Sequence, residues 1–430
     1  MLAWLERVLK QALVRTLGQV SDDGVVEPLK QHQAAPQSPT LGTRRICHFT
    51  NCDQGGIARY VEHLVSAQAR LRDSTHLAVG VFGPPRLSFP MDTERSTYAP
   101  TGVTPWGSNA WKFAAEAFFE ARRRRREGSI LHTHVFTFGA ADVHTVHGFY
   151  SRDWGSRFDV EAGTQVPLHN QVQFALLSRL ERHVIRSAHL VVFECKENQF
   201  FAEEVLEVRR PGKFHVISPG IDVSRFNPDL RAELLGNRRI LFPELNASSR
   251  WLLFVGNNFR HKGLLRLLEA MVSIPDAAPF ELLIFGNDMA ARPQAEAVAA
   301  RLQPGSVWFF RGDDRLLPAY ALSDLFLMDS RSEAGPLVLL EAMASGCVPA
   351  VTKFGIVPET VRSGHNGVVC LDSSQVASTA LSLDLQAVKE MSKEAVRTAA
   401  RRTWDAVATE YGLLYAEVHA EGYGVSGRGK

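Results

Sequence analysis

The sequence predicts an α/β protein built from two Rossmann-like, doubly wound domains, and three observations lead to this prediction. The chain has 430 residues, more than one hydrophobic core usually holds. Two stretches, one from Ile46 and one from Trp251, each run from an apolar strand through a polar loop with glycine into an amphipathic helix. Between and after them, short apolar runs alternate with helical patterns, as in parallel sheets with crossover helices.

Composition and charge exclude several other classes of protein. Charged residues make up 22% and hydrophobic residues 45% of the chain, as is usual for a globular protein. The net charge of +2 gives no indication of a nucleic-acid partner. No stretch reaches the roughly 18 consecutive apolar residues of a membrane span. The five cysteines are scattered without CxxC spacing, which favours a reducing cytoplasm over a disulfide framework or a zinc site.

The N-terminal segment is expected to lie outside the two domains. Leucines at three- or four-residue spacing from Leu2 to Leu17 predict an amphipathic helix, and the charged residues within it argue against a signal peptide. Residues 31–44 are rich in Pro, Gln and Ser, which predicts a linker. We therefore place segment 1–44 ahead of a first domain at 45–220, a second at 221–400, and a final helix with a flexible tail at 401–430.

Further strands are expected in order along both domains. Apolar runs predict strands at 129–134, 189–195 and 214–220 in the first domain, and at 281–286, 307–312, 324–330 and 348–353 in the second. One long helical pattern runs from Lys393 to about Ala420. One face of it is apolar, so we expect it to pack on a large surface; the residues of that face are Trp404, Val407, Ala408, Tyr411, Leu414 and Tyr415.

The stretch from Ser330 to Gly346 places two glutamates in unlike surroundings. Gly335 and Pro336 predict the start of a helix that ends at about Ser345, and the first free amide groups, at Leu337 and Val338, suit a phosphate. Glu341 lies about one and a half turns into this apolar helix. Burying a carboxylate there requires hydrogen-bond donors, and a ribose diol offers two side by side. Glu333, in the loop ahead, is placed to reach past the phosphates.

Several motifs together resemble a known family. The spacing of Glu333 and Glu341 resembles the E-x7-E signature of the retaining glycosyltransferases of family 4, which have the GT-B fold. The resemblance extends to QGGIARYVEHL at 54–64, TVHG at 145–148, HVISPGIDVSRFNP at 215–228, FRHKGLLRLLEAM at 259–271 and TWDAVATEYGLLY at 403–415. It covers roughly residues 45 to 415, and the short NNFRHKG loop is similar to that of the lipopolysaccharide core glucosyltransferase branch.

The resemblance implies a fold and a set of site residues. It implies a GT-B protein whose two doubly wound domains face each other across a cleft, the first binding the acceptor, the second binding the nucleotide sugar, with a C-terminal helix that crosses back. The implied catalytic residues are His147, Glu333 and Lys262, which meet the donor sugar and the diphosphate. The implied binding residues are Glu341 on the ribose, the backbone of Gly335, Pro336, Leu337 and Val338 on sugar or phosphate, and Gly55 and Gly56 close to the phosphates.

Two positions depart from the family pattern. Many members carry an arginine directly after the glycine of the second-domain strand, where this chain has Asn257, and we expect Arg260 to replace it on the diphosphate. Cys195 stands where a serine is usual. His132, His134 and His144 are alternatives to His147 for the side chain that faces the cleft. Since no cysteine or carboxylate joins these histidines at ligand spacing, no zinc cluster is expected.

The resemblance implies a retaining and metal-independent hexosyltransferase without a cofactor, and the cysteine pattern favours the cytoplasm. The expected donor is a nucleotide diphosphate sugar, a UDP-sugar in preference to a GDP-sugar, and the expected acceptor is a glycan or lipid-linked intermediate of cell-surface polysaccharide synthesis. The alternatives are a sugar-nucleotide epimerase of the same fold and a catalytically silent sugar-nucleotide-binding subunit, which Asn257 favours.

Contact with a membrane is a further prediction from the sequence. The arginines from Arg122 to Arg126, together with the helix from Leu2 to Leu17, match peripheral contact with an anionic membrane surface. Two alternatives stand beside it. The arginines also suit a solvated helix end, and the leading helix also suits docking to a partner or a second subunit.

Overall fold

The computed structural model describes residues 44–52, 55–71, 77–84, 86–90, 93–97, 108–135, 141–149, 152, 168–274, 279–311 and 315–422. The predicted helix from Leu2 to Leu17, nearly all of the predicted linker and the last eight residues lie outside this part of the chain. Among the described residues, no helix combines the length and the apolar character needed to cross a membrane.

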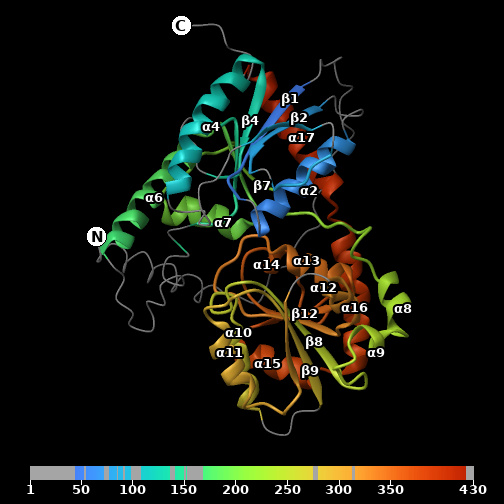
Figure 1. The fold of residues 1–430 in the computed structure, drawn as a ribbon. Coiled ribbons are helices and arrows are strands. Elements are labelled where there is room, and N and C mark those ends of the chain that lie inside the picture. The colour runs from blue at the N-terminus through green and yellow to red at the C-terminus, as the bar shows by residue number, and fades with distance from the viewer. Residues whose placement is uncertain are drawn as a thin grey trace.

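The first half of the chain forms a seven-stranded parallel sheet in the order β3-β2-β1-β4-β5-β6-β7. Figure 1 shows α4 and α6 on one side of this sheet and α2 with the last helix, α17, on the other. We call the sheet and these helices the N-lobe. Its elements are β1 (Arg44–Phe49), α2 (Gly56–Arg70), β2 (Leu77–Gly83), β3 (Glu94–Thr97), α4 (Ser108–Arg126), β4 (Ser129–Thr133), β5 (Val143–Val146), α6 (Leu168–Ser187), β6 (Leu190–Phe193), α7 (Lys196–Phe200), the π-helical turn η2 (Phe201–Val205) and β7 (Phe214–Val216).

The second half forms a six-stranded parallel sheet in the order β10-β9-β8-β11-β12-β13, which we call, with its helices, the C-lobe. Its elements are α8 (Asp229–Leu235), α9 (Arg238–Leu241), β8 (Arg250–Val255), α10 (Leu264–Val272), β9 (Phe280–Phe285), α11 (Arg292–Ala299), β10 (Val307–Phe310), α12 (Leu316–Leu322), β11 (Leu325–Met328), α13 (Leu337–Ala344), β12 (Val348–Thr352), α14 (Val357–Thr360), β13 (Val368–Cys370), α15 (Ser373–Ser382) and α16 (Leu385–Ala400). The prediction of an α/β protein with two doubly wound, Rossmann-like domains is confirmed.

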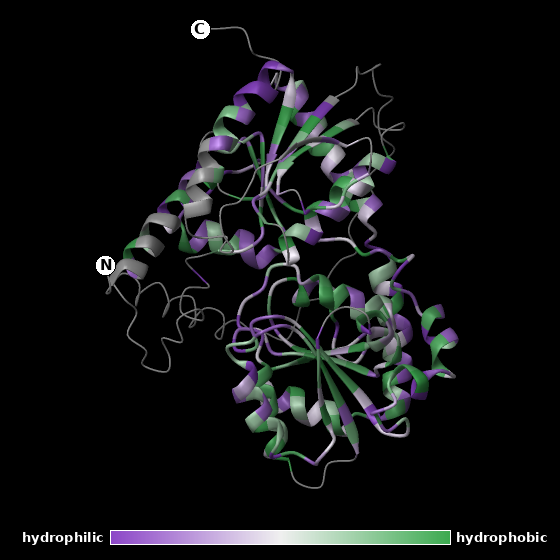
Figure 2. Cartoon of the chain, viewed as in Figure 1, coloured by the Kyte–Doolittle hydropathy of each residue, from purple (hydrophilic) through white to green (hydrophobic). Residues whose placement is uncertain are grey.

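Alternation along β8 shows why this strand reads as a continuous apolar run. Trp251, Leu253 and Val255 pack into the core under α12, α13 and α16, whereas Leu252 and Phe254 pack into the core under α10, α11 and α15. Both faces of the strand are therefore buried, as is usual for a parallel sheet between helices. Figure 2 shows the same pattern as largely hydrophobic strands inside helices with hydrophilic outer faces.

The long C-terminal helical pattern is two helices. The expectation of one stretch from Lys393 to Ala420 was wrong, because the helix is interrupted between the end of α16 and the start of α17 (Trp404–Ala420). Thr403 caps α17 by accepting a hydrogen bond from the amide of Ala406 at 3.2 Å, and Ile221 donates its amide to the carbonyl of Arg402 at 2.8 Å. The two connections between the lobes thus run side by side here, and α17 rises into the N-lobe against α2 (Figure 1). The predicted apolar face of this helix is buried as expected.

Three strands, β2, β3 and β13, had no counterpart in the sequence prediction. Strand β3 reads ERST and lies at a sheet edge, where a polar strand tolerates water, and β2 contains two glycines. The apolar pattern of β2 and β3 in the sequence was therefore weaker than that of strands buried on both faces.

The arginines at the end of α4 do not form one exposed basic patch. Arg124 is buried and its guanidinium pairs with Glu94, Glu120 and Glu127, while Arg125 pairs with buried Asp142 at 3.0 Å. The prediction that all five arginines face a membrane was wrong at Arg124, because its charge is used to hold α4 to the edge of the sheet. Arg122 and Arg126 remain exposed.

Candidate active site

The strand order of each lobe reverses direction at one point, and the two points face each other. In the N-lobe this switch lies between β1 and β4, and in the C-lobe between β8 and β11. Doubly wound proteins bind ligands outside the carboxyl ends of their strands at such a point. The loops after β8 and β11 carry Lys262 and Glu333, and the loop after β1 carries Gly55 and Gly56. We call the region where these loops meet the interlobe junction.

Glu341 is a buried carboxylate at this junction, with 2% of the residue exposed. The hydroxyl of Tyr320 donates to its Oε2 atom at 2.8 Å, and Arg59 on α2 of the opposite lobe pairs with its Oε1 atom. Burial and the neighbouring Glu341 charge hold the pKa of Tyr320 well above its ordinary value, so the phenol keeps its proton and acts as a donor. The donors that the sequence argument required for this carboxylate are thus one tyrosine and one arginine from the other lobe.

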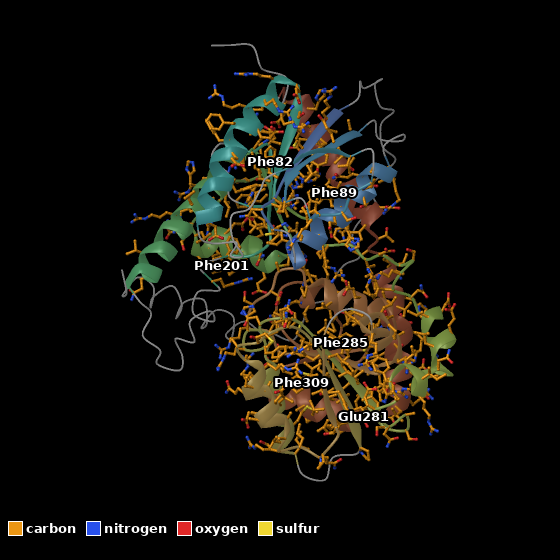
Figure 3. The ribbon with its side chains drawn as sticks, viewed as in Figure 1. Phe82, Phe89, Phe201, Glu281, Phe285 and Phe309 are labelled. Carbon is orange, nitrogen blue, oxygen red and sulfur yellow. The ribbon has the colours of Figure 1, made fainter. Side chains whose placement is uncertain are left out.

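A second buried glutamate shows that burial alone does not mark the site. Glu281 accepts hydrogen bonds from the indole of Trp308 at 2.7 Å and from the amide of Asn246 at 3.0 Å. Figure 3 places Glu281 at the end of the C-lobe far from the N-lobe. Its role is therefore to connect strand ends, whereas Glu341 faces the opposite domain.

Lys262 and Glu333 form an ion pair that joins the loops after β8 and β11. Ser330 adds a hydroxyl at 3.3 Å from the same carboxylate oxygen of Glu333. The aliphatic stem of Lys262 lies against Gly256, where a Cβ atom would collide with its Cδ. The structure therefore brings together two of the three residues predicted to be catalytic.

The helix that carries Glu341 begins one residue later than predicted. Pro336 has φ −65° and ψ 110°, so it is the residue before the helix, and Leu337 is the first helical residue. The amide of Leu339 donates to the carbonyl of Pro336 at 3.1 Å, whereas the amides of Leu337 and Val338 have no acceptor within the helix and lie at the positive end of its dipole. A Cβ atom at Gly335 would lie 2.6 Å from Pro219 Cδ and 2.8 Å from Glu194 Oε2. Only glycine lets this turn approach the N-lobe so closely.

His147 lies at the junction with its side chain 5% exposed, and both of its ring nitrogens are engaged. Nδ1 lies 2.5 Å from Glu194 Oε1, and Nε2 lies 3.0 Å from Nδ1 of His134. A sugar hydroxyl that approached this imidazole would have to displace Glu194 or bind to Glu194 itself. The predicted sugar contact of His147 stays a prediction.

The other histidines considered from the sequence lie deeper in the N-lobe. His132 contacts Tyr415 and Thr145, and His144 contacts Thr133, each at 2.8 Å. The argument against a metal cluster left out His48, whose ring nitrogen lies within 4.8 Å of those of His132 and His134. Each of these three rings already has a protein partner on both nitrogens.

Gly55 and Gly56 border open space. Among the described residues, a Cβ atom at either position would meet nothing within 4 Å, and Gly55 has φ 86°, which favours glycine. Packing of the protein itself therefore does not explain the small side chain at Gly56, and this leaves room for close approach by a ligand.

Arg260 and Asn257 do not join Lys262 at the junction. The guanidinium of Arg260 donates to Gln294 on α11 at 2.5 Å, and the Asn257 side chain accepts the amide of Asn287 at 2.7 Å. The expectation that Arg260 replaces the missing arginine stays a prediction. The arginine that pairs with Glu341 at the interlobe junction is Arg59. Cys195 is buried at the start of α7, and burial raises the pKa of its thiol to about 12, so it is not a reactive thiolate.

The sequence analysis missed the groups that cross between the lobes. Arg59 was part of a quoted motif, but an arginine on an amphipathic helix is usually solvated. Arg152 donates to the carbonyl of Glu333 at 3.3 Å, and Glu197 accepts the amide of Gly355 at 2.7 Å. No local pattern marks such residues, since their partners are more than 150 positions away in the chain.

Comparison with known proteins agrees with the motifs. The family model described as Glycosyltransferase Family 4 matches residues 54–225, and the model described as Glycosyl transferases group 1 matches residues 239–402. The chain is 33% identical to lipopolysaccharide glucosyltransferase WaaG of Escherichia coli (strain K12) over 147 residues, 33% of this chain and 38% of WaaG. It is 28% identical to D-inositol 3-phosphate glycosyltransferase of Corynebacterium urealyticum over 252 residues, 55% of this chain and 58% of that relative. The matches thus span less than two thirds of these relatives.

Solved structures share the fold over nearly the whole chain. Sucrose-phosphate synthase from Thermosynechococcus elongatus aligns with a TM-score of 0.67 at 20% identity, covering 88% of this chain and all of that one. Anabaena Alr3699/HepE, solved with UDP-glucose, aligns with a TM-score of 0.59 at 16% identity, covering 87% of this chain and 99% of that one. Since the two family models together cover more than half of the chain and both lobes follow the expected topology, this protein belongs to the GT-B glycosyltransferases of family 4.

Proposed function

We propose that the protein is a retaining hexosyltransferase that moves a sugar from a nucleotide diphosphate, a UDP-sugar in preference to a GDP-sugar, to a glycan or lipid-linked acceptor. The observation that carries the proposal is Glu341, a buried carboxylate at the junction of the two lobes whose cationic partner comes from the opposite lobe. A ribose diol supplies the same kind of donors as Arg59 and Tyr320 do in the ligand-free protein.

Charge around Glu341 supports a diphosphate next to the ribose. Lys262 provides positive charge, and the amides of Leu337 and Val338 at the start of α13 provide N–H groups for a phosphate. Binding of a diphosphate would free Glu333 from Lys262, and Glu333 is then available for sugar hydroxyls. Positioning and electrostatic stabilisation by these groups would meet the charge of the leaving diphosphate without a metal ion.

Similarity to a known enzyme supports a class of acceptor and a place in the cell. Likeness to a lipopolysaccharide glucosyltransferase favours an acceptor of cell-surface polysaccharide synthesis, used on the inner face of the cell membrane. A cytoplasmic enzyme that contacts the membrane through the helix from Leu2 to Leu17 fits this role, with Arg122, Arg123 and Arg126 as exposed cations of α4.

Thermal unfolding with UDP, GDP, ADP and their sugars tests the proposal, because a ligand that binds the folded state raises Tm by mass action. We expect a rise with one base, greatest for uridine, that is lost in Glu341→Ala but kept in Glu296→Ala, an exposed glutamate on α11. Turnover of the donor with and without acceptor then separates a transferase from an epimerase. No rise in Tm with any nucleotide would contradict the proposed nucleotide-sugar site. Binding without turnover of the donor would favour the catalytically silent sugar-nucleotide-binding subunit.

A further inference from the structure

A chain of buried polar side chains runs from the interlobe junction into the N-lobe. From Glu194 Oε1 it passes to His147 Nδ1 at 2.5 Å, and from His147 Nε2 to His134 Nδ1 at 3.0 Å. It continues from His134 Nε2 to His48 Nδ1 at 3.0 Å, and from His48 Nε2 to Gln68 Oε1 at 2.8 Å. We call these five residues the histidine chain.

The far end of the histidine chain is held by the crossover helix α17. The amide nitrogen of Gln68 donates to the hydroxyl of Tyr415 at 3.1 Å, and Tyr415 contacts His132 Nδ1 at 2.8 Å. His132 Nε2 lies 2.8 Å from the hydroxyl of Thr145, which in turn lies 2.8 Å from the hydroxyl of Tyr411. The side chains of this network are buried, so each hydrogen bond must find its donor and its acceptor within the protein.

Counting protons along the chain fixes its charge. A neutral imidazole has one N–H donor and one acceptor nitrogen. Because Gln68 Oε1 accepts from His48 Nε2, His48 Nδ1 must accept from His134, and His134 Nδ1 must in turn accept from His147. His147 Nδ1 then faces Glu194 at 2.5 Å, and this contact needs one more proton. The pair is either an imidazolium with a carboxylate or a neutral imidazole with a carboxylic acid.

A rotation of the side-chain amide of Gln68 by half a turn exchanges its oxygen and nitrogen. Donor and acceptor are then exchanged in every hydrogen bond of the histidine chain, and no hydrogen bond of this chain is lost. Gln68 then donates to His48 Nε2, His48 Nδ1 donates to His134, and His134 Nδ1 donates to His147. His147 Nδ1 donates to Glu194, which is a plain carboxylate, so this state holds one proton fewer. Burial lowers the pKa of His48 to about 4 and that of His134 well below its ordinary value, so the inner rings stay neutral in both states. The exchanged proton therefore resides at the junction end.

The proton changes the charge where the diphosphate is proposed to bind. Glu194 Oε2 lies 2.8 Å from the Cβ position of Gly335, just ahead of the first amides of α13. With the extra proton the His147 and Glu194 pair is neutral, and without it the pair is an anion. An anion there repels a diphosphate. The ionisable groups that interact electrostatically with the pair include Tyr60 on α2, Tyr411 on α17, Cys195, and the imidazoles of His132, His134 and His144.

We infer that the histidine chain is a proton-sharing device in which the orientation of Gln68 sets the protonation of the His147 and Glu194 pair, and that donor binding is coupled to uptake of one proton from solvent. No bond other than an N–H or O–H bond is made or broken. The coupling to donor binding rests on the proposed function, whereas the protonation of the histidine chain in the ligand-free protein does not. In this view His147 touches the reacting region, and Gln68, His48 and His134 are positioning residues.

Nitrogen NMR of the ligand-free protein with labelled histidine tests the chain by itself. At about neutral pH we expect His48 and His134 as neutral Nε2–H tautomers, with the extra proton on the His147 and Glu194 pair. Gln68→Met removes the acceptor at the far end and should change the His147 signals. His189→Phe, which removes a buried histidine that pairs with Glu421 outside the chain, should not. Nδ1–H tautomers of His48 and His134 at every pH, or equal effects of both variants, would overturn the inference.

Calorimetric binding of UDP in two buffers of unlike ionisation enthalpy tests the coupling. At alkaline pH, where the ligand-free pair has lost the extra proton, we expect uptake of up to one proton on binding and a Kd that rises by at most about tenfold per pH unit. Glu194→Gln and His134→Phe should flatten this dependence, and His189→Phe, which removes a histidine that pairs with Glu421, should keep it. Binding of UDP at alkaline pH without proton uptake would overturn the coupling, and absence of binding would contradict the proposed function while the NMR result still stands. Tight binding of Zn²⁺ by His48, His132 and His134, with loss of their N–H signals, would replace the chain by a metal site.

Discussion

Arg59 of the N-lobe and Glu341 of the C-lobe form an ion pair across the interlobe junction, although they are 282 positions apart in the chain. The side chain of Glu341 is 3% exposed and that of Arg59 is 35% exposed. The arginine therefore balances the buried charge of the ligand-free protein at the position where the ribose of the donor is proposed to bind.

Removal of Arg59 should destabilise the ligand-free protein more than the nucleotide-bound protein. Arg59→Ala leaves Glu341 with Tyr320 as a partner, and we expect a loss of about 1–3 kcal/mol, since water still reaches the arginine. A bound ribose would replace the lost donors. Urea unfolding with and without UDP measures the difference, with Arg70→Ala, which breaks an exposed ion pair of the same helix, as the control. An equal loss in both states would mean that Arg59 and the ribose do not share Glu341.

The two glutamates should separate binding from turnover. Glu341→Ala should raise the Kd for the nucleotide by about 10- to 100-fold, because charge-assisted hydrogen bonds are lost in both the ground state and the transition state. Glu333→Ala should mainly lower kcat if its sugar contacts strengthen in the transition state. Initial rates and nucleotide binding for both variants give the comparison. Equal loss of donor affinity in the two, with kcat unchanged, would contradict the assigned roles.

Gly256→Ala should displace the side chain of Lys262 although Lys262 itself is unchanged. The new methyl group collides with the lysine stem, so the ammonium moves away from Glu333 and from the proposed diphosphate. We expect weaker binding of UDP and a smaller effect on uridine, which lacks the phosphates. The matched change Gly412→Ala in α17 meets open space and should raise stability by about 0.5–1 kcal/mol with binding intact. Unaltered UDP affinity in Gly256→Ala would remove Lys262 from the site.

Gly56→Ala should leave stability nearly unchanged and still weaken donor binding. In the part of the chain that the structure describes, no atom outside the neighbouring residues lies within 4 Å of the added Cβ, so we expect it to meet the ligand. Gly55→Ala, in contrast, should cost about 1–2 kcal/mol, because its φ of 86° is unfavourable for a side chain. Tm and the Kd for UDP distinguish the two positions. Full donor affinity in Gly56→Ala would show that the phosphates stay away from this loop.

Stability should fall as the pH drops below about 6.5, the pKa of histidine in an unfolded chain. Burial lowers the pKa of His48 to about 4, that of His144 to about 3, and those of His132 and His134 well below the ordinary value. Below pH 6.5 the unfolded chain binds protons that these rings do not, so acid favours unfolding, by up to about 1.4 kcal/mol per pH unit for each ring.

Urea unfolding at pH values between about 7 and 5 measures this slope. His144→Phe should reduce the slope by the share of one ring. A stability that does not change over this range would show that the folded protein takes up as many protons as the unfolded chain, which contradicts the lowered pKa values of the four histidines.

The doubly wound fold and the helix of Glu341 were readable from the sequence for local reasons. Strands buried on both faces, such as β8 and β9, are continuous apolar runs, and the glycines that precede α2 and α10 mark strand-to-helix turns. The polar edge strand β3 and the break at Thr403 were not readable, because a polar edge strand resembles a loop and a helix end depends on what packs against it.

For this protein the sequence by itself determined the elements, their order and the candidate pair Glu333 and Glu341, since spacing along one strand, loop and helix is a local property. Only the tertiary structure decided which charges meet. It gave Glu341 its partner Arg59, placed Arg124 inside the N-lobe, directed Arg260 to Gln294, and joined His147 to Glu194, His134 and His48. Electrostatic and hydrogen-bond partners are chosen by distance in space and by burial, and a sequence contains neither for residues that lie far apart along the chain.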